Sequence, residues 1–138
     1  HTDYLLGDYA AAERAERAAI EARKHSPDDA VSDQRDMGEL STWLSMAVAR
    51  QGRLAEAAQL IAPVVKFQRE IAAKNHGDQW QPVELAAALY AQALADKGRS
   101  PALLHEAAAK IDALPESMRV LHDVRLWRER IRAAEQGP

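Results

Sequence analysis

The side chains best suited to chemistry in this 138-residue chain are carboxylates and imidazoles, because the sequence contains no cysteine. Asp33, Asp36 and Glu39 recur every three residues, so on a helix they form one row of acids. Neighbouring carboxylates act as general acid and base only where a cleft shifts their pKa values. The spacing alone favours a solvated helix face, with the binding of a basic peptide as the alternative.

The five histidines do not show the spacing of metal ligands, since no two of them lie three or four residues apart. They are His1, His25, His76, His105 and His122. Zinc sites on helices bring their ligands together through such short spacings. The absence of cysteine also excludes disulfides, thiolate metal sites and a thiol nucleophile. The sequence therefore predicts neither a metal nor a cofactor.

Covalent catalysis and nucleotide binding lack their sequence signatures. No serine stands in a Gly-x-Ser-x-Gly elbow, and the six glycines are isolated instead of forming a phosphate-binding loop. A formal net charge of −3 argues against a partner with a phosphate backbone or an anionic lipid surface. No apolar run approaches the ~20 residues of a membrane span. We therefore predict that the protein is not an enzyme and binds neither nucleic acid nor membrane.

Helices must position any binding site, because apolar residues recur at helical spacing and strand-like alternation is absent. The expected helices span residues 8–24, 27–51, 54–75, 81–98, 100–114 and 116–134, after the last turn of an earlier helix at residues 3–7. The second begins either at Pro27, after the capping residue Ser26, or near Asp33. Pro63 predicts a kink or a junction of two helices.

Tryptophan positions divide into two kinds. Trp43 and Trp127 fall at packing positions of their helices, the latter together with Val120, Val124 and Ile131 in the last one. Trp80 stands just before a helix start. It is the tryptophan that we expect to be partly exposed.

Three glycines organise the chain into repeats. Gly7, Gly52 and Gly98 are 45 and 46 residues apart, and each separates an apolar helix end from an alanine-rich helix start. A glycine just past a helix end readily adopts the left-handed conformation that allows a tight reversal. Self-similarity at such a period predicts stacked helical hairpins.

The elbows resemble those of the tetratricopeptide repeat, in which a glycine is followed by a large apolar residue and then by alanine. Gly7, Tyr9 and Ala12 match this pattern, as do Gly52, Leu54 and Ala57. The resemblance implies an all-α, right-handed superhelix of about three helical hairpins, at residues 1–25, 27–75 and 81–114, closed by a C-terminal capping helix at residues 116–135. The family's period is about 34 residues, so this is a divergent form with longer repeats.

The resemblance also implies a function. A module of this kind binds a peptide or protein surface in a concave groove lined by the first helix of each pair. The candidate contacts are Thr42, Met46, Arg50, Ala88, Gln92 and Asp96. The alternatives are a small-molecule sensor with a pocket between helices, and self-association. Because the chain opens in mid-pattern at His1, we expect a C-terminal scaffold or regulatory part of a larger cytoplasmic protein.

Overall fold

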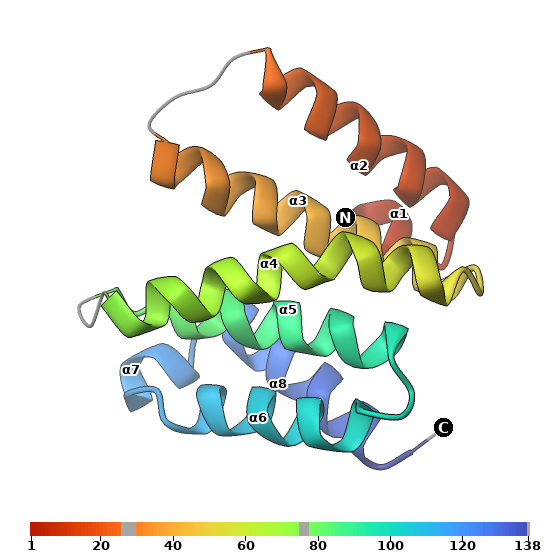
Figure 1. Cartoon of the computed structure of the whole chain (residues 1–138). Coiled ribbons are helices and arrows are strands. Elements are labelled where there is room, and N and C mark those ends of the chain that lie inside the picture. The colour runs from red at the N-terminus through yellow and green to blue at the C-terminus, as the bar shows by residue number, and fades with distance from the viewer. Residues whose placement is uncertain (26–29, 75–77, 138) are drawn as a thin grey trace.

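The computed structural model describes residues 1–25, 30–74 and 78–137, and within these residues it forms eight helices and no strand. Figure 1 shows their arrangement. The helices are α1 (Thr2–Leu5), α2 (Tyr9–Lys24), α3 (Ala30–Arg50), α4 (Leu54–Lys74), α5 (Gln81–Ala95), α6 (Ser100–Asp112), α7 (Glu116–Arg119) and α8 (His122–Glu135). The prediction of an all-helical chain is confirmed for the described residues. The expected helix start at Ser26–Pro27 and the residues 75–77 that follow α4 lie outside them.

Two of the three predicted elbows have left-handed glycines. Gly7 (φ 84°) separates α1 from α2, and Gly52 (φ 86°) separates α3 from α4. Asp8 begins α2 by accepting a hydrogen bond of 3.1 Å from the amide of Ala11, which satisfies one of the free amides at a helix start. The glycines therefore reverse the chain where the repeat pattern predicts a turn.

The third elbow is built differently from the prediction. α5 ends at Ala95, before Gly98, and Gly98 does not have a positive φ. Instead, the Asp96 carboxylate accepts a hydrogen bond of 3.2 Å from the backbone amide of Arg99. A short acidic side chain stabilises such a turn by bonding a nearby backbone amide, so left-handed glycine geometry is not needed here.

The structure also decides two expectations about where helices are interrupted, one at Pro63 and one near Leu121. α4 continues without interruption through Pro63, which excludes a junction of two helices there. The single helix expected at residues 116–134 is wrong, because the backbone at Leu121 is extended (φ −66°, ψ 142°) and divides α7 from α8. Val120 consequently leaves the apolar stripe and is 59% exposed, whereas Val124, Trp127 and Ile131 are buried as expected.

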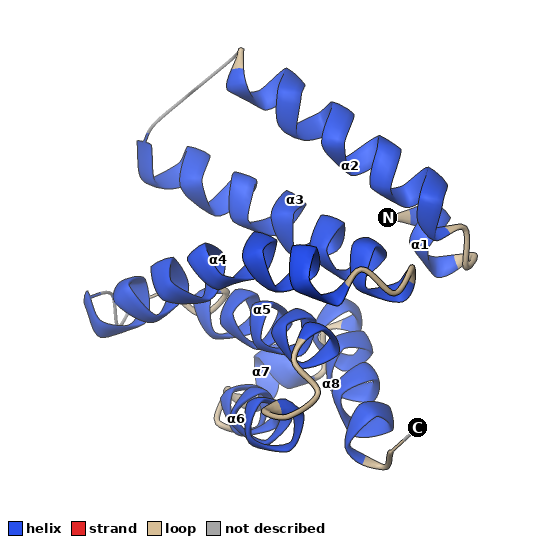
Figure 2. Cartoon of the chain, turned by 45° about the vertical axis from the view of Figure 1, so that its right-hand side comes forward, coloured by secondary structure: helices blue, strands red, loops and turns tan. Residues whose placement is uncertain are grey.

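The core is centred on α5. Eleven of its 15 residues are buried, and it packs against α3, α4, α6 and α8. Figures 1 and 2 show α2 and α3 at one end of the molecule and α6 to α8 at the other, with α4 and α5 between them. Six buried alanines of α5 (Ala86, Ala87, Ala88, Ala91, Ala93 and Ala95) allow its neighbours to approach closely. α2, in contrast, buries only Ala12 and Glu16.

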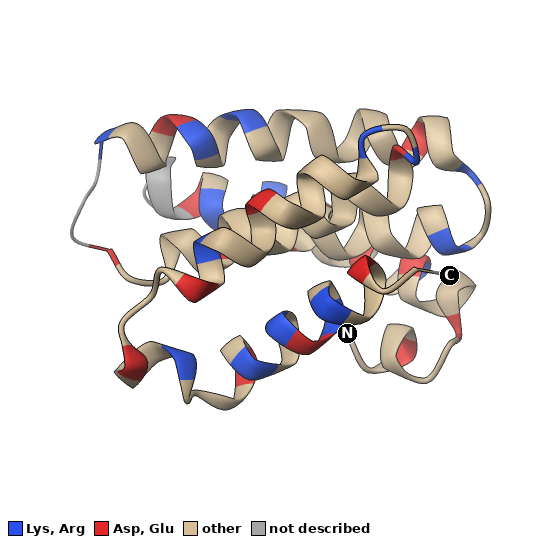
Figure 3. Cartoon of the chain, turned by 90° about the horizontal axis from the view of Figure 1, so that it is seen from below, with Lys and Arg blue, Asp and Glu red and all other residues tan. Residues whose placement is uncertain are grey.

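No helix in the described part of the chain is both long and apolar enough to cross a membrane. Basic and acidic residues are interspersed over the face drawn in Figure 3.

Candidate functional site

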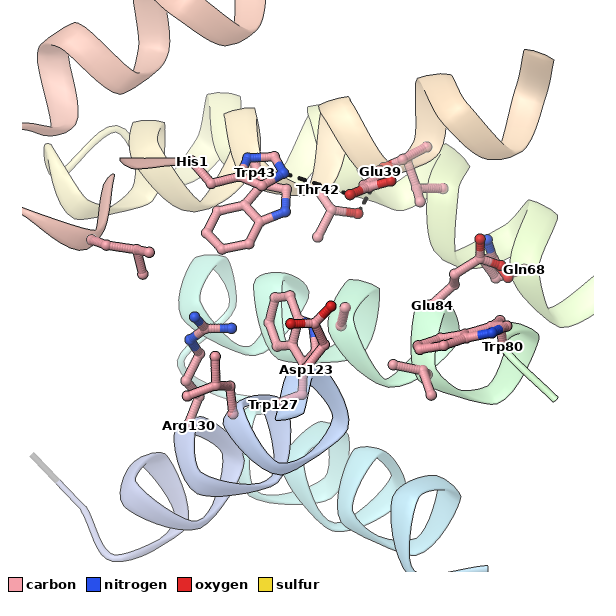
Figure 4. A pocket seen from close by; sticks show the side chains of 16 residues that line it. His1, Glu39, Thr42, Trp43, Gln68, Trp80, Glu84, Asp123, Trp127 and Arg130 are labelled. Carbon is pink, nitrogen blue, oxygen red and sulfur yellow. Dashed lines mark hydrogen bonds and ion pairs between the residues drawn. The ribbon is translucent and has the colours of Figure 1, made fainter. Parts of the chain in front are cut away.

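A cavity of about 420 Å³ lies between α1, α3, α4, α5 and α8. All three tryptophans of the chain line it: Trp43 from α3, Trp80 from the residue before α5, and Trp127 from α8. Figure 4 shows these side chains together with the charged residues around them. We call this space the tryptophan cavity. Its remaining lining residues are His1, Leu5, Gly38, Glu39, Thr42, Val64, Gln68, Val83, Glu84, Ala87, Asp123, Leu126 and Arg130.

Close contact between α3 and α4 forms one wall. A side-chain carbon added at Gly38 would lie 3.4 Å from Cγ1 of Val64, so glycine lets these helices approach. The Thr42 hydroxyl donates a hydrogen bond of 2.8 Å back to the carbonyl of Gly38. Thr42 is buried, and this bond satisfies its donor inside the wall.

A buried pair of amides joins α4 to the start of α5 beside the cavity. The Gln81 side-chain nitrogen donates to the backbone carbonyl of Gln68 at 2.8 Å and to its side-chain oxygen at 2.9 Å. The two residues are only 3% and 2% exposed. Because Gln81 is the first residue of α5, the pair fixes the start of that helix against α4.

Aromatic rings are in contact across the cavity. The rings of Trp43 and Trp127 are 5.5 Å apart, Tyr4 meets Trp43 edge-on at 5.5 Å, and Tyr90 meets Trp127 edge-on at 5.9 Å. The imidazole of His1 stacks on Trp43 with centroids 4.0 Å apart and planes 14° apart. This cluster joins α1, α3, α5 and α8 at one place.

Two cations of the chain already contact these rings. The guanidinium carbon of Arg130 lies 4.6 Å from the Trp127 ring centroid and 5.4 Å from that of Trp43, which is within the range of cation–π attraction. His1 Nδ1 lies 3.0 Å from a carboxylate oxygen of Glu16, and its Nε2 lies 3.5 Å from Glu39. The hydrogen bond to Glu16, followed by that to Glu39, raises the pKa of His1 to about 9. His1 is therefore a cation at neutral pH.

The three carboxylates of the cavity have different partners. His1 lowers the pKa of Glu39, chiefly through their hydrogen bond. Glu84 accepts a hydrogen bond of 2.9 Å from Arg35 Nε, and although Arg35 opposes it, burial raises the pKa of Glu84. Asp123 is exposed and has no ion-pair partner among the described residues.

The six candidate groove residues do not form one site. Met46 and Ala88 are fully buried in the core, so they are not available to a partner. Arg50 donates hydrogen bonds to the hydroxyls of Tyr4 at 3.0 Å and Tyr90 at 3.2 Å. Thr42 lines the tryptophan cavity, but Gln92 lies in a separate surface cleft, with Lys66 and Arg69. Asp96 stabilises the turn before α6.

The expected helices do line the cavity, but apart from Thr42 they do so with residues other than the predicted ones. Glu39 and Trp43 face it from α3, and Glu84 and Ala87 face it from α5. Each residue step turns a helix by about 100°, so a one-residue difference in register replaces one set of contacts by another. Repeat spacing identifies the helices and leaves their rotation undetermined.

The acidic row lies on a largely exposed face of α3, and two of its members pair with a base of α2. Arg23 donates to Asp33 at 3.0 Å and to Asp36 at 2.7 Å, which ties α2 to α3. Glu39, with a side chain 62% exposed, is the member that reaches the cavity. Glu16 of α2 is only 5% exposed and lies beneath His1. Its i+4 spacing from the buried Ala12 is the sequence signal that places it on the buried side of the helix.

Across residues 1–25, 30–74 and 78–137, no three histidine, aspartate or glutamate side chains converge in a way that would hold a metal ion. The arrangement instead offers aromatic faces with carboxylates beside them, which is the chemistry of cation and side-chain binding. Comparison with models of known protein families, with curated proteins and with solved structures gives no match to this chain.

Proposed function

We propose that the protein is a non-catalytic interaction module that receives a segment of a partner protein in the tryptophan cavity. The observation that carries this proposal is the convergence of Trp43, Trp80 and Trp127 from three separate elements on one open cavity. Tryptophan is enriched among residues that dominate binding energy at protein interfaces. Trp80 is 45% exposed and available to a partner, while Trp43 and Trp127, 7% and 9% exposed, form the packed aromatic wall beside it.

The size and openness of the cavity favour part of a peptide over a fully enclosed small molecule. Its volume of about 420 Å³ is near the lower end of the 300–1,000 Å³ typical of ligand pockets. Trp80 is 45% exposed and Asp123 is exposed as well, so one part of the wall remains in contact with water. A small ligand is normally covered over most of its surface, whereas a peptide inserts one or two side chains and leaves the rest outside.

The state of the carboxylates supports a binding role. Glu39 faces His1 and Glu84 faces Arg35, so each is paired with a base. Of the three carboxylates that line the cavity, only Asp123 has no ion-pair partner in the described residues, so the cavity does not offer two unpaired carboxyls to act as acid and base.

We further propose that the helical hairpins follow a tetratricopeptide-like superhelical path. The left-handed glycines at residues 7 and 52 and the packing of successive helices support this arrangement. In that geometry α3, α5 and α8 would line the inner surface, which is where the tryptophan cavity lies.

Selection from a displayed library of random 12-residue peptides tests the function. Binding of a selected peptide is followed by ¹H–¹⁵N NMR of the three indole N–H groups, all of which belong to the cavity. We expect at least one indole signal to shift, and Trp80→Ala to weaken binding about tenfold or more. The control is Leu6→Ala, which removes a 78% exposed apolar side chain that does not line the cavity. Peptides that bind without moving any indole signal, or that bind Trp80→Ala as tightly as wild type, contradict the proposal.

A further inference from the structure

We propose that the partner segment binds in an extended form through two uncharged apolar side chains four residues apart, one against Trp80 and the other against Leu5. This inference rests on the proposed function and identifies the chemistry and the spacing of its ligand. It follows from three properties of the tryptophan cavity: the balance of its charges, the position of its exposed apolar side chains, and its length and width.

The charges in and beside the tryptophan cavity balance. Three acids are matched in number by three bases, namely Glu39, Glu84 and Asp123 against His1, Arg130 and Arg35. Two of the acids, Glu39 and Glu84, already form ion pairs within the chain. A ligand side chain of either charge would meet as many like charges as opposite ones, and it would lose hydration on entering. The cavity therefore favours an uncharged side chain.

Two exposed apolar side chains belong to the lining, and they come from different parts of the chain. Trp80 is 45% exposed and precedes α5, whereas Leu5 is 60% exposed and ends α1. Cations of the chain itself lie against the other two indoles. Among the described residues of the lining, Trp80 and Leu5 are thus the large apolar side chains that a ligand can still cover. Figure 4 shows Trp80 at one end of the cavity and His1, the residue next to α1, at the other.

Helix α3 runs between the two ends and gives their separation. At one end, the imidazole of His1 stacks on Trp43 with centroids 4.0 Å apart. At the other end, Arg35 binds Asp78, whose carboxylate also accepts a hydrogen bond of 2.9 Å from the backbone amide of Trp80. Arg35 and Trp43 are eight residues apart in the sequence, which corresponds to about 12 Å along a helix.

An extended chain fits this length and width better than a helix does. A volume of about 420 Å³ over this length leaves a cross-section of roughly 35 Å², whereas a helix with its side chains is about 10–12 Å in diameter. In an extended chain each residue advances about 3.3 Å, and alternate side chains share one face. Residues i and i+4 therefore lie about 13 Å apart on the same face. Two apolar side chains at this spacing reach both ends of the cavity.

The test is an alanine scan of a 12-residue peptide that has been selected on the full chain and shifts an indole signal. We expect alanine at two apolar positions, four residues apart, to weaken binding about fivefold or more in each case. Replacing any charged residue of the peptide should change Kd less than about twofold. Raising the salt concentration from about 0.05 to 0.5 M should likewise change Kd less than about threefold, because salt screens charge pairs and leaves apolar contacts in place.

Variants of the protein assign each apolar side chain of the peptide to one end of the cavity. On Trp80→Ala one of the two alanine replacements should cost less than about twofold, and on Leu5→Ala the other should, because the contact is already gone. A helical pair at i and i+4 is only about 6 Å apart and cannot couple to both ends. Leu6→Ala is the matched control and should behave as wild type, since Leu6 is 78% exposed beside Leu5 but does not line the cavity.

The outcomes separate this inference from the function on which it rests. If peptides shift the indole signals and need Trp80, but binding depends on a basic or acidic residue, falls tenfold or more with salt, or is unchanged by Leu5→Ala, the apolar two-point ligand is refuted and the binding module stands. If the two coupled side chains are seven residues apart, the ligand is a helix and the extended form is refuted. If no peptide reaches the cavity, both proposals fail.

Discussion

Replacing Gln81 by methionine should destabilise the protein by about 2 kcal/mol, because the change leaves a buried acceptor without its donor. Gln81 and Gln68 are both almost fully buried, and the Gln81 amide is the group that bonds the side-chain oxygen of Gln68 at 2.9 Å. Methionine is similar in length and unbranched, so it fills the same space without a donor. Gln68 lies inside α4, where its backbone carbonyl keeps a helical partner, so one acceptor remains unsatisfied. An unsatisfied buried polar group costs ~1–3 kcal/mol.

A double-mutant cycle decides whether the amide pair itself is responsible. Gln68→Met should also cost about 2 kcal/mol, since it leaves the Gln81 amide partly unsatisfied. The double variant removes both polar groups, and we expect it to lose at least about 1 kcal/mol less than the sum of the single variants. Urea unfolding at constant m-value measures each free energy of unfolding.

Gln136→Met is the control, because Gln136 is exposed and surface changes usually stay within about 0.5 kcal/mol. Additive losses in the double variant, or a Gln81→Met protein as stable as wild type, would refute the reasoning. Because Gln68 lines the tryptophan cavity, the indole NMR signals of each variant also show whether the cavity is preserved.

Three further changes test other parts of the structure. Gly52→Ala should lower the free energy of unfolding by about 1–2 kcal/mol in urea, because φ is +86° at this residue although there is space for a side chain. Gly98→Ala is the control and should cost less, because Gly98 has no positive φ. Equal losses of stability in the two variants would contradict the argument. The pKa of His1 is about 9 instead of the ordinary 6.5, so the stability that His1 contributes is present below pH 6.5 and is lost as the pH rises through 9. Glu16→Gln should flatten this decline when unfolding midpoints are measured against pH. An unchanged pH profile would show that the His1–Glu16 pair is not its cause. Ile61→Ala removes a fully buried side chain and should cost ~2–5 kcal/mol in thermal or urea unfolding, a prediction that a loss under 1 kcal/mol would overturn.

Much of the helical framework is predictable from the sequence because its causes are local. The glycines at residues 7 and 52 mark turns, Asp8 begins a helix, and α4 keeps its apolar stripe through Pro63. The exposure of Trp80 follows in the same way from its place before a helix start. The division of α7 from α8 at Val120–Leu121 has no comparable marker in glycine or proline, so helical periodicity alone joins them.

The binding site is a different matter, because it depends on how the helices are rotated and packed. Repeat spacing selected α3 and α5 but favoured Met46 and Ala88, which the structure buries, over Trp43 and Glu84, which line the cavity. A turn of about 100° per residue makes this choice sensitive to a single step of register. Amphipathic patterns separate buried from exposed faces, but an open cavity at the boundary of the two belongs to neither.

The sequence by itself determined that the chain is helical, where most of its helices turn, and that three tryptophans are available. These properties depend on backbone conformation and on residues a few positions apart. Only the tertiary structure decided that Trp43, Trp80 and Trp127 meet in one cavity, that Glu16 is buried under His1, and that Asp123 is left without a partner in the described residues. Those properties come from contacts between helices distant in the sequence, which periodicity within one helix does not encode.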